Sequence, residues 1–445
     1  MTEPSATEPL SSESSPWRSL WNLPEDVAYL NHGSFGPSPI VVQESYEHWT
    51  RQLEQQPMNF FLREMEPALE ESLAVLANFV GTSRGNLVFV DNATFGMNIV
   101  AASTRLDTDD EVLVNDHEYG AVTRLWRRTC QQAGARLVTC ELPASDFHNE
   151  SIVESVFARV TSRTKLIVVS HVTSPTALVM PVEEICRRAK ELGIPVCIDG
   201  PHAVAMLPLN LRKLDCDFYT ASCHKWLSAP FGSGFLYVAP RQQKRIRPAV
   251  VSWGGSIGGR QPGWKDEFNW LGTRNPAAFL ATADAIRFLQ STTSSRSDMQ
   301  TQEFAEPTKP HTMLDEFQQR SRQLTQLAIT ELARTIAAKP LINEQALRSD
   351  SMVSLVLPAE LFPTETSVGK AGHRHPLQDW LWQQHRIEIP LVAWRDQLLI
   401  RVSAHLYNSA AEYSQLAGAV REFAELSSKS RDSSTTTTLS LKPRR

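Results

Sequence analysis

The amino-acid sequence predicts an α/β protein: a large domain built on a mostly parallel seven-stranded sheet flanked by helices, followed by a smaller C-terminal α+β domain. Three observations lead to this fold class. Between about residues 80 and 240, short β-branched runs alternate with longer amphipathic segments, as in a parallel sheet covered on both faces. A polar stretch interrupts the chain at 291–311. The segments after it mix helices and strands, which is typical of an α+β domain.

Seven apolar runs are the predicted strands of the large domain, because each is rich in β-branched or aromatic residues and bounded by polar or turn-forming residues. They are NLVFV (86–90), EVLVN (111–115), RLVTC (136–140), KLIVVS (165–170), PVCID (195–199), FYTAS (218–222) and GFLYV (234–238). Helices are predicted over 119–132 and 181–192, and Gly193 suits the position that follows a helix C-terminus.

The smaller domain is predicted from a second group of segments. They are a long helix near 313–337, the strand SMVSLVLP (351–358), a helix near 376–385, a strand pair formed by IEIPL (387–391) and QLLIRVS (397–403), and a final helix from Asn408.

A chain of 445 residues is longer than one hydrophobic core usually serves, so two domains plus tails are expected. The large domain is placed at 46–290, a linker or surface loop at 291–311, and the small domain at 312–427. Residues 1–15 and 428–445 are rich in Ser, Thr and charge and are expected to be disordered tails.

Composition excludes several classes of protein. Apolar residues make up 42% and charged residues 21%, with a net charge of −5, so no nucleic-acid or membrane partner is expected. The six cysteines form no CxxC pair, which argues against disulfides and zinc, and no metal site is expected. The first residues lack an export signal and no run of about 20 apolar residues occurs, so a cytoplasmic protein is expected.

The most informative segment is SCHKW, in which Lys225 follows an apolar strand and precedes the Pro/Gly-rich SAPFGSG. Burial lowers the pKa of a lysine amine, which suits a lysine that forms a Schiff base. A structural lysine whose amine reaches solvent is the alternative.

Two further segments end predicted strands at the carboxyl edge of the sheet, where ligands of open α/β sheets bind. In VCIDGPHA, Asp199 would hold a protonated pyridine nitrogen in its charged form, or would cap the next turn. In DNATFGMN, Asn92, Ala93 and Thr94 open a helix whose N-terminus suits an anion such as a phosphate. Capping alone explains these residues equally well.

The motifs strand-DNAT-helix, DHEY, HVTSP, DGPHA, SxHK, GTR and RVSxxxYN occur in one fixed order. Together they resemble the class V aminotransferase family of fold-type I pyridoxal-phosphate enzymes, and most closely its isopenicillin N epimerase-like branch. The resemblance covers roughly residues 25–425. It implies pyridoxal 5′-phosphate as the cofactor and a homodimer with shared active sites.

Carried over motif by motif, the resemblance implies that Lys225 is the catalytic residue and forms the internal aldimine. Asp199 would pair with the pyridine nitrogen and His202 would hydrogen-bond the phenolic oxygen. The remaining implied cofactor contacts are Ser222, His224, Ala93 and Thr94 at the phosphate, Tyr119 over the ring with His117 as a rival, Ser174 near the phenolic oxygen, and Thr273 reaching the phosphate of the neighbouring subunit.

The resemblance also implies the substrate contacts. Arg401 would clamp the substrate α-carboxylate, a role suited to a planar guanidinium, although a structural ion pair is the alternative. YLNHGSFGPSP resembles an N-terminal arm (16–45) that lies over the active site, which makes Asn31 and His32 substrate contacts. Arg63 in FFLRE would bind a distal carboxylate, or it is a solvated helix-face arginine.

The cofactor fixes a class of chemistry but not the product. An epimerase-like or aminotransferase-like enzyme that deprotonates Cα through Lys225 is ranked first, with a carbon–sulfur lyase as the alternative. His32, Tyr119 and His171 are candidates for the proton donor opposite Lys225 in an epimerase. No cysteine follows Cys223, which argues against cysteine desulfurase chemistry. A non-catalytic binding protein on the same fold is the alternative of another class.

Overall fold

A computed structural model describes residues 14–145, 147–293, 310–363 and 374–432. Two compact units make up the chain. The large unit comprises residues 33–314 and 342–349, and the smaller unit comprises the chain up to His32 together with residues 315–341 and from Asp350 onward. The predicted N-terminal arm (16–45) is therefore divided between the two units. The described residues include no helix that is long and apolar enough to cross a membrane.

The large unit is built on the sheet that the sequence predicts. Its seven strands are β2 (Leu87–Val90), β3 (Glu111–Asn115), β4 (Arg136–Cys140), β5 (Thr164–Ser170), β6 (Val196–Asp199), β7 (Phe218–Ser222) and β8 (Gly234–Val238). Their order is β2-β8-β7-β6-β5-β3-β4. Strand β8 runs antiparallel to both neighbours and every other pair is parallel. The predicted α/β fold class is thus confirmed.

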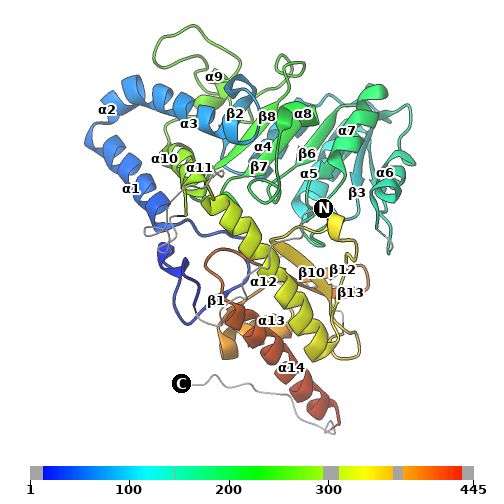
Figure 1. The fold of residues 1–445 in the computed structure, drawn as a ribbon. Helices are drawn as coiled ribbons and strands as arrows, with labels where there is room; N and C mark the ends of the chain where they lie inside the picture. The colour runs from blue at the N-terminus through cyan, green and yellow to red at the C-terminus, as the bar shows by residue number, and fades with distance from the viewer. Residues whose placement is uncertain (1–13, 146, 294–309, 364–373, 433–445) are drawn as a thin grey trace, which may run out of the picture. The chain divides into compact units, whose positions relative to one another are not determined.

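Helices cover both faces of this sheet, as the strand order requires. The connections from β2 to β3 and from β3 to β4 lead one way across the sheet, whereas those from β4 through β7 lead back. Because such crossovers are right-handed, α4 (Ala93–Ser103) and α5 (Gly120–Ala133) share one face, while α6 (Asn149–Phe157), α7 (Val182–Glu191) and α8 (Leu211–Leu214) share the other. These elements can be followed in Figure 1.

The remaining elements of the large unit are helical. They are α1 (Ile40–Gln55), α2 (Pro57–Asn59), the π-helix η2 (Phe60–Glu64), α3 (Met65–Phe79), η3 (Arg84–Asn86), α9 (Asp266–Asn269), α10 (Ala277–Leu280), α11 (Thr282–Gln290) and η5 (Gln345–Leu347). A β-bridge joins Thr292, near the start of the predicted linker 291–311, to Thr312, the residue after it, and most of the linker lies outside the described residues.

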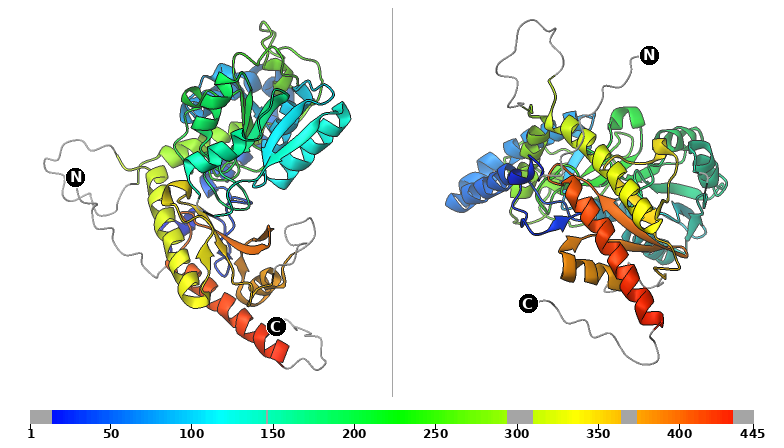
Figure 2. Two further views of the ribbon diagram at one scale, coloured as in Figure 1. Left: turned by 90° about the vertical axis from the view of Figure 1, so that its right-hand side faces the viewer. Right: turned by 60° about the horizontal axis from the view of Figure 1, so that its bottom comes forward.

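The smaller unit has a four-stranded sheet of order β12-β13-β10-β9. The long helices α12 and α14, yellow and red in Figure 2, contribute side chains to one hydrophobic core together with strands of this sheet. Its elements are η1 (Arg18–Leu20), β1 (Ala28–Tyr29), α12 (Met313–Ile336), β9 (Lys339–Pro340), β10 (Met352–Val356), α13 (Pro376–His385), β11 (Ile387–Glu388), β12 (Leu391–Trp394), β13 (Gln397–Ser403) and α14 (Ala410–Asp432).

Two predictions for this unit were wrong in detail. IEIPL is not one strand paired with QLLIRVS: β11 pairs in parallel with β1, and β12 is the partner of β13. Pro390 separates β11 from β12, because proline has no N–H to donate to a strand ladder. The helix α14 continues to Asp432, so it includes the first residues of the predicted tail 428–445, and Ser15 at the other predicted tail is buried. Residues 1–13 and 433–445 lie outside the described residues.

Gly234, at the start of β8, allows the first residues of α4 to approach the sheet. A Cβ atom there would lie 2.6 Å from the carbonyl oxygen of Ala221 and 2.9 Å from the Cα of Asn92. Both distances are shorter than van der Waals contact and involve main chain, which cannot move aside without shifting the strand or the helix. A residue without a side chain therefore sets how closely α4 lies against β8.

Replacing Gly234 by Ala should lower the free energy of unfolding by about 1–3 kcal/mol through overpacking. The matched control is Gly418→Ala in α14, where a Cβ atom would have no neighbour within 4 Å and alanine should stabilise the helix by up to about 1 kcal/mol. Denaturant unfolding of both variants measures the difference, and equal effects would contradict the close approach at Gly234.

Candidate active site

Polar residues end three neighbouring parallel strands at one edge of the large sheet. Ser170 ends β5 beside Asp199, its register partner at the end of β6, and Ser222 ends β7. Because parallel strands present their carboxyl ends at the same edge, these side chains and the loops that follow them share one region, as ligand-binding residues do in open α/β sheets.

Lys225, in the loop after β7, lies beside His202, in the loop after β6. The Lys225 Nζ atom is 3.1 Å from His202 Nε2, and the indole N–H of Trp226 donates to His202 Nδ1 at 3.3 Å. An indole N–H can only donate, so Nδ1 carries no proton and a neutral His202 carries its proton on Nε2. When it is neutral, the Lys225 amine accepts this hydrogen bond with its lone pair.

Asp199 is a buried carboxylate, 5% exposed, whose oxygens have no hydrogen bond or ion pair with any described residue. Burial raises its pKa to about 6, and the charge of Lys225 opposes that rise. A buried carboxylate without a donor is costly. Its environment therefore suits a ligand that brings a charged N–H group.

The N-terminus of α4 provides the polar groups for an anion. The Ser222 hydroxyl accepts the N–H of Ala93 at 2.9 Å, and the Asn92 side chain caps the helix through the N–H of Phe95. Thr94 is exposed, and no described residue binds its hydroxyl. Free N–H and hydroxyl groups at the positive end of a helix favour a phosphate.

His224 lies next to Lys225 in the loop after β7. Burial, followed by the nearby lysine charge, lowers the pKa of its imidazole to about 4. It is therefore neutral at physiological pH. Its Nδ1 atom is buried and has no hydrogen-bond partner among the described residues.

Tyr119 and His117 were rival candidates for a ring stacked over a ligand. Tyr119 is 47% exposed, at the N-cap of α5. His117 is fully enclosed, with its Nδ1 2.8 Å from the hydroxyl of Thr176 and its ring edge-on to Phe147. Only the Tyr119 ring therefore has a face open to a ligand. Ser174 is half-buried in the loop after β5.

Glu118, between these two aromatic residues, is a site residue that the sequence did not single out. Its side chain is 7% exposed and accepts a hydrogen bond from the Ser170 hydroxyl at 2.6 Å. A glutamate just before a helix is usually expected to be exposed to solvent or to cap the helix. The apolar strand ends around it were the only signal of its burial.

His171 was a candidate proton donor, but its surroundings do not favour that role. It is buried, its Nδ1 lies 3.0 Å from the hydroxyl of Tyr219, and burial lowers its pKa to about 4. The imidazole is therefore neutral at physiological pH and has no spare proton to give as an imidazolium.

Arg63 and Thr273, both in the large unit, are exposed. Arg63 lies on the π-helix η2 and binds the side chain of Asn59 at 3.3 Å. Within the described part of this unit, neither residue forms a hydrogen bond or ion pair with the residues around Lys225.

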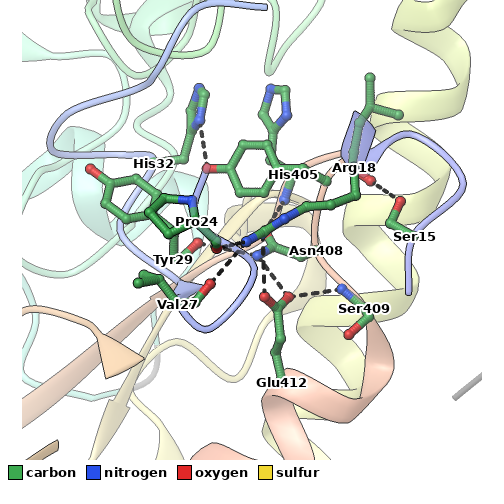
Figure 3. Close-up of polar contacts among 12 residues, drawn as sticks. Ser15, Arg18, Pro24, Val27, Tyr29, His32, His405, Asn408, Ser409 and Glu412 are labelled. Carbon is green, nitrogen blue, oxygen red and sulfur yellow. Dashed lines mark hydrogen bonds and ion pairs between the residues drawn. The ribbon is translucent and has the colours of Figure 1, made fainter. Parts of the chain in front are cut away.

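The smaller unit holds the other predicted residues. Arg401 is 4% exposed in the middle of β13, opposite Ser354 of β10. His32 stacks on His405 with ring centroids 4.0 Å apart, and its Nδ1 is 2.9 Å from the Tyr407 hydroxyl (Figure 3). Asn31 is also buried, and its Oδ1 has no hydrogen-bond partner among the described residues.

A network that the sequence did not reveal holds this cluster in place (Figure 3). Arg18 forms an ion pair with Glu412 at 3.6 Å, and the Asn408 side-chain amide donates to the carbonyl of Tyr29 and to Glu412. The N-terminal segment is thereby tied to the start of α14. These partners are distant in sequence, so no local pattern could have indicated the pairing.

The fold and the residues around Lys225 define a fold-type I pyridoxal-phosphate enzyme. The cofactor's features match the site: an amine for its aldehyde, a buried carboxylate for its ring nitrogen, and a helix N-terminus for its phosphate. The aminotransferase class-V family model matches residues 39–311. The chain belongs to this family, whose cofactor is pyridoxal phosphate.

The chain is similar to relatives of more than one kind. The chain is 31% identical to isopenicillin N epimerase of Streptomyces clavuligerus over 409 residues, covering 89% of this chain and 95% of the relative. It is 30% identical to putative L-cysteine desulfhydrase 1 of Oryza sativa subsp. japonica, covering 59% of this chain and 57% of the relative. Among solved structures, the cystine C–S lyase C-DES with its product cysteine persulfide has a TM-score of 0.70 at 20% identity, covering 89% and 97% of the two chains.

Among the described residues, no group of three or more His, Cys, Asp or Glu side chains is arranged to hold a metal ion.

Replacing Trp226 by Phe should raise the pH at which Lys225 becomes reactive. Without the indole donor, His202 can place its proton on Nδ1 and accept a hydrogen bond from a charged lysine. One such hydrogen bond contributes about 0.5–1.5 kcal/mol, which corresponds to a shift of up to about one pH unit. The measurement is the rate of imine formation between the apoprotein and pyridoxal as a function of pH.

Trp264→Phe is the control for this experiment, because the Trp264 indole also donates a hydrogen bond, to the carbonyl of Gly85. It should leave the pH profile unchanged. An unshifted profile in the Trp226→Phe protein would contradict the proton arrangement assigned to His202.

Proposed function

We propose that this chain catalyses a reaction at the α-carbon of an amino acid or amino-acid-derived substrate, of the isopenicillin N epimerase-like or class V aminotransferase-like kind. Lys225 is the residue that binds pyridoxal phosphate covalently. The observation that carries the proposal is the contact between the Lys225 amine and His202 at 3.1 Å, beside the bare carboxylate of Asp199.

The residues of the large unit would hold the cofactor. Pyridoxal phosphate, when bound, withdraws electrons from the bonds at the α-carbon of an attached amino acid. Asp199 would pair with the ring nitrogen, His202 would donate to the phenolic oxygen with Ser174 nearby, and Tyr119 would cover the ring. Ser222, His224, Ala93 and Thr94 would hold the phosphate.

Lys225 then acts as the general base that removes the α-proton. A base must have a free lone pair when the substrate arrives, and its pKa must suit the working pH. In the structure His202 directs its one N–H to the Lys225 amine, and with the cofactor bound the same N–H would go to the phenolic oxygen instead.

The smaller unit would bind the rest of the substrate. Arg401 suits the α-carboxylate because a guanidinium binds a carboxylate with two parallel hydrogen bonds. Asn31, with a buried amide oxygen that lacks a partner, and His32 are further substrate contacts. Arg63 of the large unit is assigned to a distal carboxylate.

The share of each relative's length that matches this chain supports ranking epimerisation or transamination first. Two isopenicillin N epimerases match along 95–97% of their own length, so the similarity extends to the C-terminal part, to which we assign substrate binding. The cysteine desulfhydrases match over only 57–60% of theirs. The chain spans under two thirds of those relatives.

A carbon–sulfur lyase that works by β-elimination is the second candidate. It is favoured by the relatives named L-cysteine desulfhydrase and by the fold shared with the C–S lyase C-DES. A desulfurase mechanism that uses a cysteine of the small domain is not proposed, since no cysteine follows Cys223.

We also propose a homodimer in which Thr273 reaches the phosphate of the neighbouring subunit. Thr273 is exposed, and no described residue of its own chain binds its hydroxyl, which supports a contact with a second copy.

Lys225→Ala should abolish the absorbance band of lysine-bound cofactor and borohydride trapping of pyridoxal phosphate, and should lower turnover by several orders of magnitude, because no other described residue presents an amine beside Asp199. The reaction is then assigned with the wild-type protein by incubating it with D- and L-amino acids and thioether amino acids. Chiral chromatography, a keto-acid assay and a pyruvate assay separate epimerisation, transamination and elimination.

Lys213→Ala is the control, since Lys213 is exposed on α8; it should bind cofactor normally. A normal band in the Lys225→Ala protein would overturn the lysine assignment. Pyruvate as the sole product would replace the first-ranked reaction by the lyase.

The affinity of the apoprotein for pyridoxal phosphate should rise with pH through about 6. Asp199 has a pKa raised to about 6, so below this pH its carboxyl is protonated and cannot pair with a charged ring nitrogen. Fluorescence titration of the apoprotein between pH 5 and 8 measures the affinity. The Asp199→Asn protein should bind more weakly and lack this rise, whereas identical profiles would exclude Asp199 as the ring partner.

A further inference from the structure

Glu118 is a buried carboxyl group that the proposed function leaves unused. It occupies the turn between β3 and α5, immediately before Tyr119. Its Oε1 atom accepts two hydrogen bonds, from the Ser170 hydroxyl at 2.6 Å and from the main-chain N–H of Tyr119 at 2.9 Å. The side chain therefore fixes the main chain that carries the Tyr119 ring to the end of β5.

The same contact places Glu118 next to Asp199. Ser170 and Asp199 are register partners on adjacent parallel strands, and side chains at paired positions lie on the same face of a sheet. A carboxyl group bound to the Ser170 hydroxyl is therefore close to the Asp199 carboxylate. Two carboxylates at such close range do not both ionise readily, because their charges repel each other in a region shielded from water.

The other titratable groups that act on this pair do not supply a positive charge to Glu118. Cys197 of β6 and Cys140 of β4 are buried thiols whose pKa values are raised by burial first and, to a smaller extent, by nearby carboxylates that include Glu118. Lys225 acts on Asp199 and lowers the pKa of that residue. When it is charged, Lys225 therefore favours the ionised form of Asp199.

One oxygen of the Glu118 carboxyl group has no donor to stabilise a negative charge. Glu118 Oε2 is buried and has no hydrogen-bond partner among the described residues. A bare, charged oxygen in such a position is expensive, whereas a protonated oxygen costs much less. Burial, followed by the charge of Asp199, raises the pKa of Glu118 to about 8.

We propose that Glu118 is a positioning residue that remains protonated at neutral pH, so that it anchors the main chain of Tyr119 while leaving Asp199 as the only negative charge of the pair to face the ring nitrogen of the cofactor. The proposal rests on the roles assigned above to Asp199 and Tyr119. It separates two functions that one carboxylate could not perform together: Glu118 supplies an acceptor without a charge, and Asp199 supplies the charge.

The first test is cofactor affinity at pH 7, measured by fluorescence titration of apoproteins with pyridoxal phosphate. Glu118→Gln keeps a neutral side chain and the oxygen that accepts from Ser170 and Tyr119, so its affinity should stay within about twofold of wild type. Asp199→Asn loses a needed charge and should bind at least about tenfold more weakly, a difference of about 1.4 kcal/mol. If Glu118→Gln weakens binding as much as Asp199→Asn does, Glu118 is charged and the proposal fails.

The second test uses the apoprotein and needs no cofactor. An unfolded glutamate ionises near pH 4.5, whereas Glu118 in the folded protein keeps its proton up to about pH 8. The folded state therefore binds more protons than the unfolded state between these values, and stability is lost as the pH rises through that window. Relative to wild type, Glu118→Gln should become progressively more stable from about pH 5 to about pH 8 and then level off.

Thermal unfolding of both apoproteins across this range gives the result. Glu141→Gln is the matched control, because Glu141 is exposed and makes no ion pair in the described residues; its stability difference from wild type should not change with pH. If the stability difference between the Glu118→Gln protein and wild type is also independent of pH, the proposal is overturned. Because this measurement does not involve the cofactor, it stands even if the Lys225→Ala experiment contradicts the proposed function.

Discussion

The parallel register of β5, β6 and β7 is the constraint on which the candidate active site depends. It sets Ser170, Asp199 and Ser222 at one edge of the sheet, and the loops that leave these strands carry His202 and Lys225. A one-residue slip in register would turn every side chain of a strand to the opposite face. Helices bury these strands on both faces, so a slip would disrupt close side-chain packing on both sides of the sheet.

The carboxyl edge of the large sheet holds several buried polar groups that lower the stability of the folded protein. Two carboxyl groups, Glu118 and Asp199, are buried beside each other, and Asp199 has no donor among the described residues. Such arrangements reduce stability unless a ligand compensates for them. Enzymes commonly retain destabilising groups where chemistry requires them, so the large hydrophobic core beneath the sheet offsets what the site costs. A bound cofactor would stabilise the folded state further by mass action.

The sequence was sufficient for most of the fold because the signal was repeated and local. β3, β4, β7 and β8 begin and end at the predicted residues, since each is a short run rich in β-branched, aromatic or other apolar residues. IEIPL was predicted as one strand because apolar residues lie on both sides of Pro390, where the strand is in fact interrupted. Lys225 and Asp199 could be found from their positions after strands. Glu118 could not, because its burial depends on Ser170, which lies 52 residues away. The Arg18–Glu412 pair is likewise invisible to any local pattern.

The N-terminal segment has a consequence for how the chain is made. Ser15 donates a hydrogen bond to the carbonyl of Leu406 across 391 residues of sequence, and β1 finds its only described partner in β11. Residues 14–32 leave the ribosome long before the residues that bind them are synthesised. The large unit can fold while translation continues. The smaller unit must wait for nearly the whole chain, and closing so long a loop makes its assembly a late and slow step.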